Sequence, residues 1–142
     1  MDIFKVIPLG SIGPVKIGMK ESEVQQVIGR PTFVDGSRKE YLSGYFVNYD
    51  SDNRVEYIEV WDSDGFGIDF NGINPLKVDP RDAVKHIESF DKYDEDDPEL
   101  GDSYIFKSIQ VSLWRGSTFK DSDEKIEKEF ESLGIGKQGY YR

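Results

Sequence analysis

Alternating apolar and polar positions mark the middle of the chain as strand-rich. Two extended runs, Glu40 to Asp50 and Arg54 to Trp61, are separated by only three residues. In that connection, Asp52 and Asn53 both tolerate left-handed backbone conformations, which suits a tight turn. The second run carries apolar side chains on both of its faces, as a strand inside a packed sheet does. The pattern therefore predicts a β-hairpin.

Shorter strands are expected on either side of this hairpin, bounded by glycine and asparagine. Apolar residues alternate with polar ones after residue 108, which is typical of a sheet with one solvated face. The expected segments are Pro14 to Ile17, Phe66 to Phe70, Tyr104 to Phe106, Ser108 to Trp114 and, as an edge strand, the tail from Gln138 to Arg142.

A first helix is predicted within the segment from Met19 to Ile28. Val24, Val27 and Ile28 lie at i, i+3 and i+4, which places them on one helical face. Gly29 suits the position just after the helix, and the proline two residues later cannot continue it.

A second helix is expected to begin at Asp79, with this residue as the N-cap and Pro80 at the first helical position. His86 falls beside the buried face, where a structural role is the simpler interpretation. That face is expected to consist of Ala83, Val84, Ile87 and Phe90.

A third helix is predicted after Asp121, which with Glu124 resembles a capping box. Its apolar face would hold Ile126, Phe130 and Leu133, and Gly134 would end it.

Short turns join most of the expected strands, so their pairing should be mainly antiparallel. We expect residues 1–142 to form one α+β domain, with a sheet of about five to seven strands and about three helices packed largely on one face.

Charge and cysteine content exclude several classes of function. The chain has 28 acidic and 18 basic residues, a net charge of −10, and no cysteine. Nucleic acid and anionic membrane surfaces are therefore unfavourable partners, and disulfides and thiolate chemistry are excluded. No charged leader precedes an apolar stretch at the N-terminus, and no apolar window of about 18 residues occurs. We expect a cytoplasmic protein.

The most distinctive segment runs from Asp91 to Asp102. It holds seven acidic residues and one lysine, a net −6 within 12 residues. Such a run is often only a solvated loop. It is also suited to steering a basic partner, with an aromatic side chain as anchor. The candidate partner-binding residues are Tyr93, Asp94, Glu95, Asp96, Asp97, Glu99 and Asp102; further candidate anchors are Tyr45, Tyr49, Tyr57, Trp61 and Trp114.

No catalytic residue, cofactor site or metal site is expected. The runs beginning at Asp50 and Asp62 start like calcium loops. The former lacks the glycine and the closing glutamate that such loops need, and the latter lacks the glutamate. Asp-assisted turns explain both runs. The chain has a single histidine and shows no nucleophile or phosphate-binding motif.

The segment from Gly13 to Pro31 resembles a signature of bacterial domains related to the β-lactamase-inhibitor-protein fold and to small outer-membrane assembly lipoproteins. The matching residues are Gly18, Met19, Val24, Val27, Ile28, Gly29 and Pro31. The chain departs from the lipoproteins because it has no cysteine to carry a lipid.

In size, charge and its opening segment from Val6 to Pro14, the chain also resembles the small acidic immunity proteins of bacterial polymorphic toxin systems. The partner of a wall-associated, Rhs-repeat toxin that cleaves tRNA is the nearest likeness. This resemblance implies a cytosolic protein that binds a basic toxin domain, a nuclease, and blocks its active site or substrate groove.

Two alternatives remain open. One is a non-catalytic module that binds a protein of another kind. The other is an acid-based hydrolase, which would need two close carboxylates in a concave pocket. No spacing in the sequence singles out such a pair among the 28 acidic residues.

Overall fold

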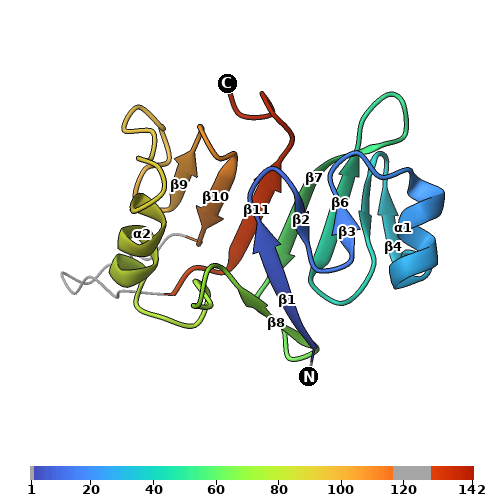
Figure 1. Ribbon diagram of the computed structural model, residues 1–142, viewed down its shortest axis with the longest axis horizontal. Helices are drawn as coiled ribbons and strands as arrows, with labels where there is room; N and C mark the ends of the chain where they lie inside the picture. Colours follow the sequence, from blue (N-terminus) through green and yellow to red (C-terminus); the bar gives the residue numbers. More distant parts are fainter. Residues whose placement is uncertain (1, 117–128) are drawn as a thin grey trace.

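Two β-sheets pack against each other in the computed structural model, which describes residues 2–116 and 129–142 (Figure 1). The seven-stranded sheet is antiparallel throughout and has the order β4 (Phe33–Asp35), β5 (Arg38–Glu40), β6 (Tyr45–Tyr49), β7 (Val55–Trp61), β11 (Ser132–Gly136), β10 (Val111–Trp114), β9 (Ser103–Phe106). The four-stranded sheet has the order β3 (Val15–Lys16), β2 (Ser11–Ile12), β1 (Asp2–Ile7), β8 (Phe66–Asp69), and its β1–β8 pair is parallel. The expected α+β class with mainly antiparallel pairing is confirmed.

The predicted hairpin is the β6–β7 pair at the centre of the large sheet. Tyr45 pairs with Val60 and Asn48 with Tyr57, and a bulge shifts the register at the turn end. Asn53 adopts a φ of 61°, the left-handed conformation that the sequence allowed. The hairpin prediction is confirmed.

Two helices occur within the described residues, α1 (Glu21–Ile28) and α2 (Pro80–Glu88). In Figure 1, α1 lies toward the β4 end of the molecule and α2 toward the β9 end. The Asp79 side chain accepts a hydrogen bond from the backbone N–H of Arg81, so the predicted N-cap is confirmed. Gly29 follows α1 with a φ of 85°, as expected for a residue that ends a helix.

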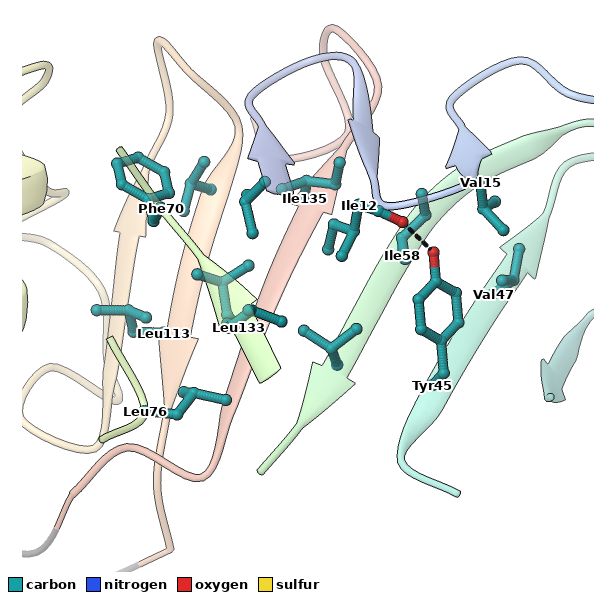
Figure 2. Close-up of a cluster of buried hydrophobic side chains, with 14 of the residues drawn as sticks. Ile12, Val15, Tyr45, Val47, Ile58, Phe70, Leu76, Leu113, Leu133 and Ile135 are labelled. Atoms are coloured by element: carbon teal, nitrogen blue, oxygen red, sulfur yellow. Dashed lines mark hydrogen bonds between the residues drawn. The ribbon is translucent and has the colours of Figure 1, made fainter. Parts of the chain in front are cut away.

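The hydrophobic core lies between the two sheets. Inward side chains of the large sheet, such as Ile58 and Val47, face Ile12 and Val15 of the small sheet (Figure 2). Tyr45 crosses the interface and donates a hydrogen bond from its phenol to the Ile12 carbonyl. Both helices contribute to the same core through Val24, Ala83, Val84 and Ile87.

The C-terminal half of the predicted third helix is wrong. Leu133 and Gly134 belong to β11, which lies between β7 and β10. Their helical spacing with Phe130 was coincidental: Leu133 and Ile135 alternate with small residues, so one face of the strand enters the core. Residues 121–128 of that prediction lie outside the described residues.

Two smaller expectations also fail. Phe90, expected on the buried face of the second helix, lies beyond the end of α2 at Glu88 and is 50% exposed. The tail from Gln138 to Arg142 forms turns instead of an edge strand, and it packs on the large sheet, where Tyr140 stacks on Tyr57 and the Tyr141 hydroxyl bonds to Ser112. Of the helices in the described ranges, none is long and apolar enough to cross a membrane.

Candidate functional site: an aromatic pocket beside the acidic loop

The segment from Asp91 to Asp102, called the acidic loop below, connects α2 to β9 and is fastened to the β9–β10 hairpin. Its Asp94 N–H donates to the Ile105 carbonyl at 2.7 Å, and the Asp91 carboxylate accepts from the Ser108 N–H at 2.9 Å. Near its end, the Arg115 N–H donates to the Asp102 carbonyl at 2.8 Å. The loop therefore has a defined course along the edge of the large sheet.

Some of its carboxylates shape the loop, and others face solvent. Asp94 accepts from the Asp96 N–H and pairs with Lys107 at 3.2 Å; these contacts, in that order, lower the pKa of Asp94. Asp97 accepts from the Glu99 N–H at 2.9 Å. The exposed acidic side chains are those of Glu95, Asp96 and Glu99, while Asp94, Asp97 and Asp102 are half-buried.

Tyr93 points toward the core. Its ring lies edge-on to Tyr104 at 5.1 Å and to Phe106 at 6.1 Å between centroids, and it packs against the buried cluster. Among the other candidate anchors, Tyr45, Tyr49 and Tyr57 are buried.

The remaining candidate anchors meet on the outer face of the large sheet, the face turned away from the small sheet. Cross-strand pairing places Trp61, Ser132 and Trp114 in one row. The next row on the same face, two residues further along each strand, consists of Glu59, Gly134 and Ser112. Since successive residues of a strand point to opposite faces, these six residues share one face.

Small residues on β11 leave room between β7 and β10. The two indole rings lean together over Ser132, with centroids 5.4 Å apart and planes at 60°. Beside them is a pocket of about 370 Å³, called the outer pocket below. It is lined by Tyr57, Glu59, Trp61, Glu99, Ser103, Ile105, Ser112, Trp114, Ser132 and Tyr141.

The acidic loop and the outer pocket are thus continuous. Glu99 belongs to both, and Ser103 follows the loop directly as the first residue of β9. The structure therefore brings one predicted partner-binding residue, Glu99, together with the three predicted anchors Tyr57, Trp61 and Trp114.

A group of three hydroxyls lies on one side of the pocket. The Tyr141 hydroxyl is 2.8 Å from Ser112 Oγ and 3.1 Å from the Tyr57 hydroxyl. Burial raises the pKa of both tyrosines, and the nearby Glu59 carboxylate raises each further. These phenols are therefore held protonated, the opposite of what an activated nucleophile requires.

Two buried polar atoms near this site have no hydrogen-bond partner among the described residues. They are Trp61 Nε1 and Asp97 Oδ2. Leaving such atoms unpaired costs about 1–3 kcal/mol each. Asp97 is close enough to the pocket for its carboxylate to raise the pKa of Tyr141, after the larger effects of burial and Glu59.

Other residues with potential chemistry are occupied by structural contacts. The Asp50 carboxylate accepts from the Asp52 and Arg54 N–H groups, as an Asp-assisted turn does. His86 Nε2 lies 3.1 Å from the Phe70 carbonyl oxygen, which ties α2 to the end of β8. Within residues 2–116 and 129–142, no three acidic or histidine side chains gather as a metal site would require.

Sequence reasoning identified the aromatic side chains but missed Glu59, Ser112 and Tyr141. Their proximity depends on β11, which the sequence pattern had assigned to a helix. The two tryptophans at the ends of their strands were the available signal, since a large side chain on a solvent-facing row often lies in a binding site.

Comparison of the chain with protein-family models, curated proteins and solved structures found no match. The function of this protein must therefore be inferred from the geometry and chemistry of the site.

Proposed function

We propose that this protein is a cytoplasmic immunity protein, which binds a cognate basic toxin domain and blocks its active site or substrate groove. A nuclease, for example one that cleaves tRNA, fits best because its phosphate-binding groove must be basic. The observation that carries the proposal is the continuity of the acidic loop with the outer pocket. A rim of carboxylates next to partly exposed indoles combines electrostatic steering with apolar anchoring.

The charge of the whole molecule supports the same partner. Its net charge of −10 attracts a cationic domain from a distance and repels nucleic acid. Glu95 and Asp96, at the exposed tip of the loop, are free of the contacts that hold Asp94 and Asp97 in place.

The chemistry of the pocket favours recognition over catalysis. Its phenols are kept protonated, and Glu59 is in contact with Arg38 at 3.5 Å, so one of the two lining carboxylates is already paired. A hydrolase would instead need two carboxylates free to act on a bond between them.

The test is co-expression with the C-terminal domain of whatever protein is encoded directly upstream of this one, as the candidate toxin. We expect restored growth and a 1:1 complex that is weakened by salt. Growth inhibition that persists when both proteins are present and folded would overturn the proposal. A complex without rescue would support a binding module of another kind.

A further inference from the structure

The outer pocket combines the faces of aromatic rings with carboxylates, and both favour a positively charged ligand over a negatively charged one. Trp61 and Trp114 offer partly exposed aromatic rings, whose faces are electronegative, while the buried Tyr57 ring is stacked on Tyr140 with centroids 4.6 Å apart. The charged residues among those that line it are Glu59 and Glu99, both acidic. A phosphate or carboxylate ligand would be repelled, and a cation would be attracted both by the rings and by the carboxylates.

Part of this negative charge lacks a counter-charge within the described chain. Glu59 is 3.5 Å from Arg38, but Glu99 extends from an exposed turn, and Asp97 Oδ2 is buried without a hydrogen-bond partner in residues 2–116 and 129–142. Burial is the main cause of the raised pKa of Tyr141, and the carboxylates of Glu59 and Asp97 raise it further.

The shape and the acceptors favour a planar cation over a spherical one. A guanidinium group stacks on aromatic rings, is weakly hydrated, and presents five N–H donors to acceptors around it. The carboxylate oxygens of Glu99 and the Ser103 hydroxyl lie on the lining, whereas the Glu59 carboxylate is already paired with Arg38 at 3.5 Å. An ammonium group shares the charge but cannot stack, and it loses more hydration on entry.

We infer that the outer pocket is the receptor for one arginine side chain, presented by the basic partner and held by the indole pair and Glu99. This inference rests on the proposed function for its partner, but the pocket's selectivity can be measured without that partner. In a complex, such a buried arginine would act as the central anchor, with the acidic loop as the steering rim.

The chain carries its own reporter, because its only two tryptophans, Trp61 and Trp114, both line this pocket. We would titrate the protein with blocked arginine (Nα-acetyl-arginine N-methylamide) and follow tryptophan fluorescence. Blocked lysine and blocked citrulline are the matched probes, since citrulline keeps the shape of arginine without its charge. We expect saturable binding of arginine with a Kd in the millimolar range, weaker binding of lysine and no response to citrulline.

Two variants locate the binding site. Glu99→Gln removes the charge at the pocket and should weaken arginine binding about tenfold, the loss of one charge-assisted contact. Glu95→Gln makes the same change in the same loop, but outside the pocket, and should leave binding unchanged. Equal responses to citrulline and arginine, equal affinities for lysine and arginine, or equal losses in the two variants would each overturn the inference.

The two proposals fail separately. If the toxin is neutralised but the pocket ignores arginine, the arginine receptor is wrong and the immunity function stands. If arginine binds as described but no toxin domain is neutralised, the pocket stands and the partner must be sought elsewhere.

Discussion

Tyr57 lies across the Cα of Gly134 on the outer face of the large sheet, so closely that a Cβ on Gly134 would be 1.9 Å from the phenol oxygen. The same Cβ would be 2.5 Å from Tyr57 Cζ and 2.9 Å from Ser112 Oγ. Glycine at this position therefore leaves room for the hydroxyls of Tyr57, Ser112 and Tyr141 to meet over the middle of β11.

Replacing Gly134 with alanine should destabilise the fold by about 1–3 kcal/mol, because the ring of Tyr57 and its neighbours must shift to admit a methyl group. Urea unfolding of the variant measures the loss. Gly65→Ala is the control, since the nearest atom to a Cβ there is 3.6 Å away in an open turn. Similar stabilities for the two alanine variants would contradict the packing described here.

Tyr45→Phe should destabilise the protein by about 1–3 kcal/mol, because the Ile12 carbonyl would lose its phenol donor inside the core. This hydrogen bond joins the two sheets, and Tyr45 is 0% exposed, so water cannot replace the donor (Figure 2). Denaturant unfolding gives the free energy. Tyr140→Phe is the matched control, because the Tyr140 hydroxyl has no hydrogen bond to the described residues; an equal cost in both variants would exclude a special role for Tyr45.

The N-cap of α2 should make part of the stability depend on acid. The Arg81 side chain and its backbone N–H both hydrogen-bond to the Asp79 carboxylate and lower its pKa from 3.8 to about 2. Because the folded pKa is depressed, this contribution is present above pH 3.8 and is lost as the pH falls toward about 2. An NMR titration of the carboxyl group measures the pKa directly.

Arg81→Gln is the companion variant, which removes the side-chain contact while leaving the backbone N–H in place. The Asp79 pKa should then move back toward 3.8, and stability should decline at a correspondingly higher pH. An unchanged titration in the variant would mean that the guanidinium does not hold the carboxylate in solution.

Charge reversal at the exposed tip of the acidic loop should slow association with the toxin domain. Glu95→Lys with Asp96→Lys removes carboxylates that make no turn contact through their side chains apart from the exposed Lys92–Glu95 pair at 3.0 Å. At low salt the association rate constant should fall several-fold, with little change in dissociation. Stopped-flow fluorescence over a series of salt concentrations measures both.

The matched control reverses Asp35 and Asp52, which are exposed in β4 and in the β6–β7 turn. The net charge changes by the same amount in both double variants, so only the position of the charges differs. If both double variants slow association equally, the effect arises from the overall charge of the protein, and the acidic loop has no special role in association.

Local patterns predicted the elements that local interactions determine. The Asp79–Pro80 start of α2 and the Asp52–Asn53 turn depend on backbone preferences of a few residues, and both are confirmed. The two sheets could not be predicted in the same way, because β1 pairs with β8 across a long stretch of sequence and most β1 side chains are exposed.

The sequence pattern does not predict the strand β11, because its amino-acid composition is not typical of a strand. Gly134 and Gly136 have low strand propensity, and Phe130 with Leu133 imitates helical spacing. β11 lies between β7 and the β9–β10 hairpin and joins them into one sheet. Because the sequence pattern did not predict β11, it did not predict the outer pocket between these strands either. The aromatic residues of the pocket were identifiable as anchors, but their common location required the correct pairing.

The central position of β11 also sets the order in which the chain can fold. Until residues 132–136 have left the ribosome, β7 and β10 each present an unpaired edge, and the large sheet exists only as two separate pieces. Completing it requires contacts between residues far apart in the sequence, which slows folding and leaves those edges open to other chains in the meantime. A nascent chain of this protein can therefore complete its aromatic pocket only after β11 has been synthesised, because β11 pairs with both β7 and β10.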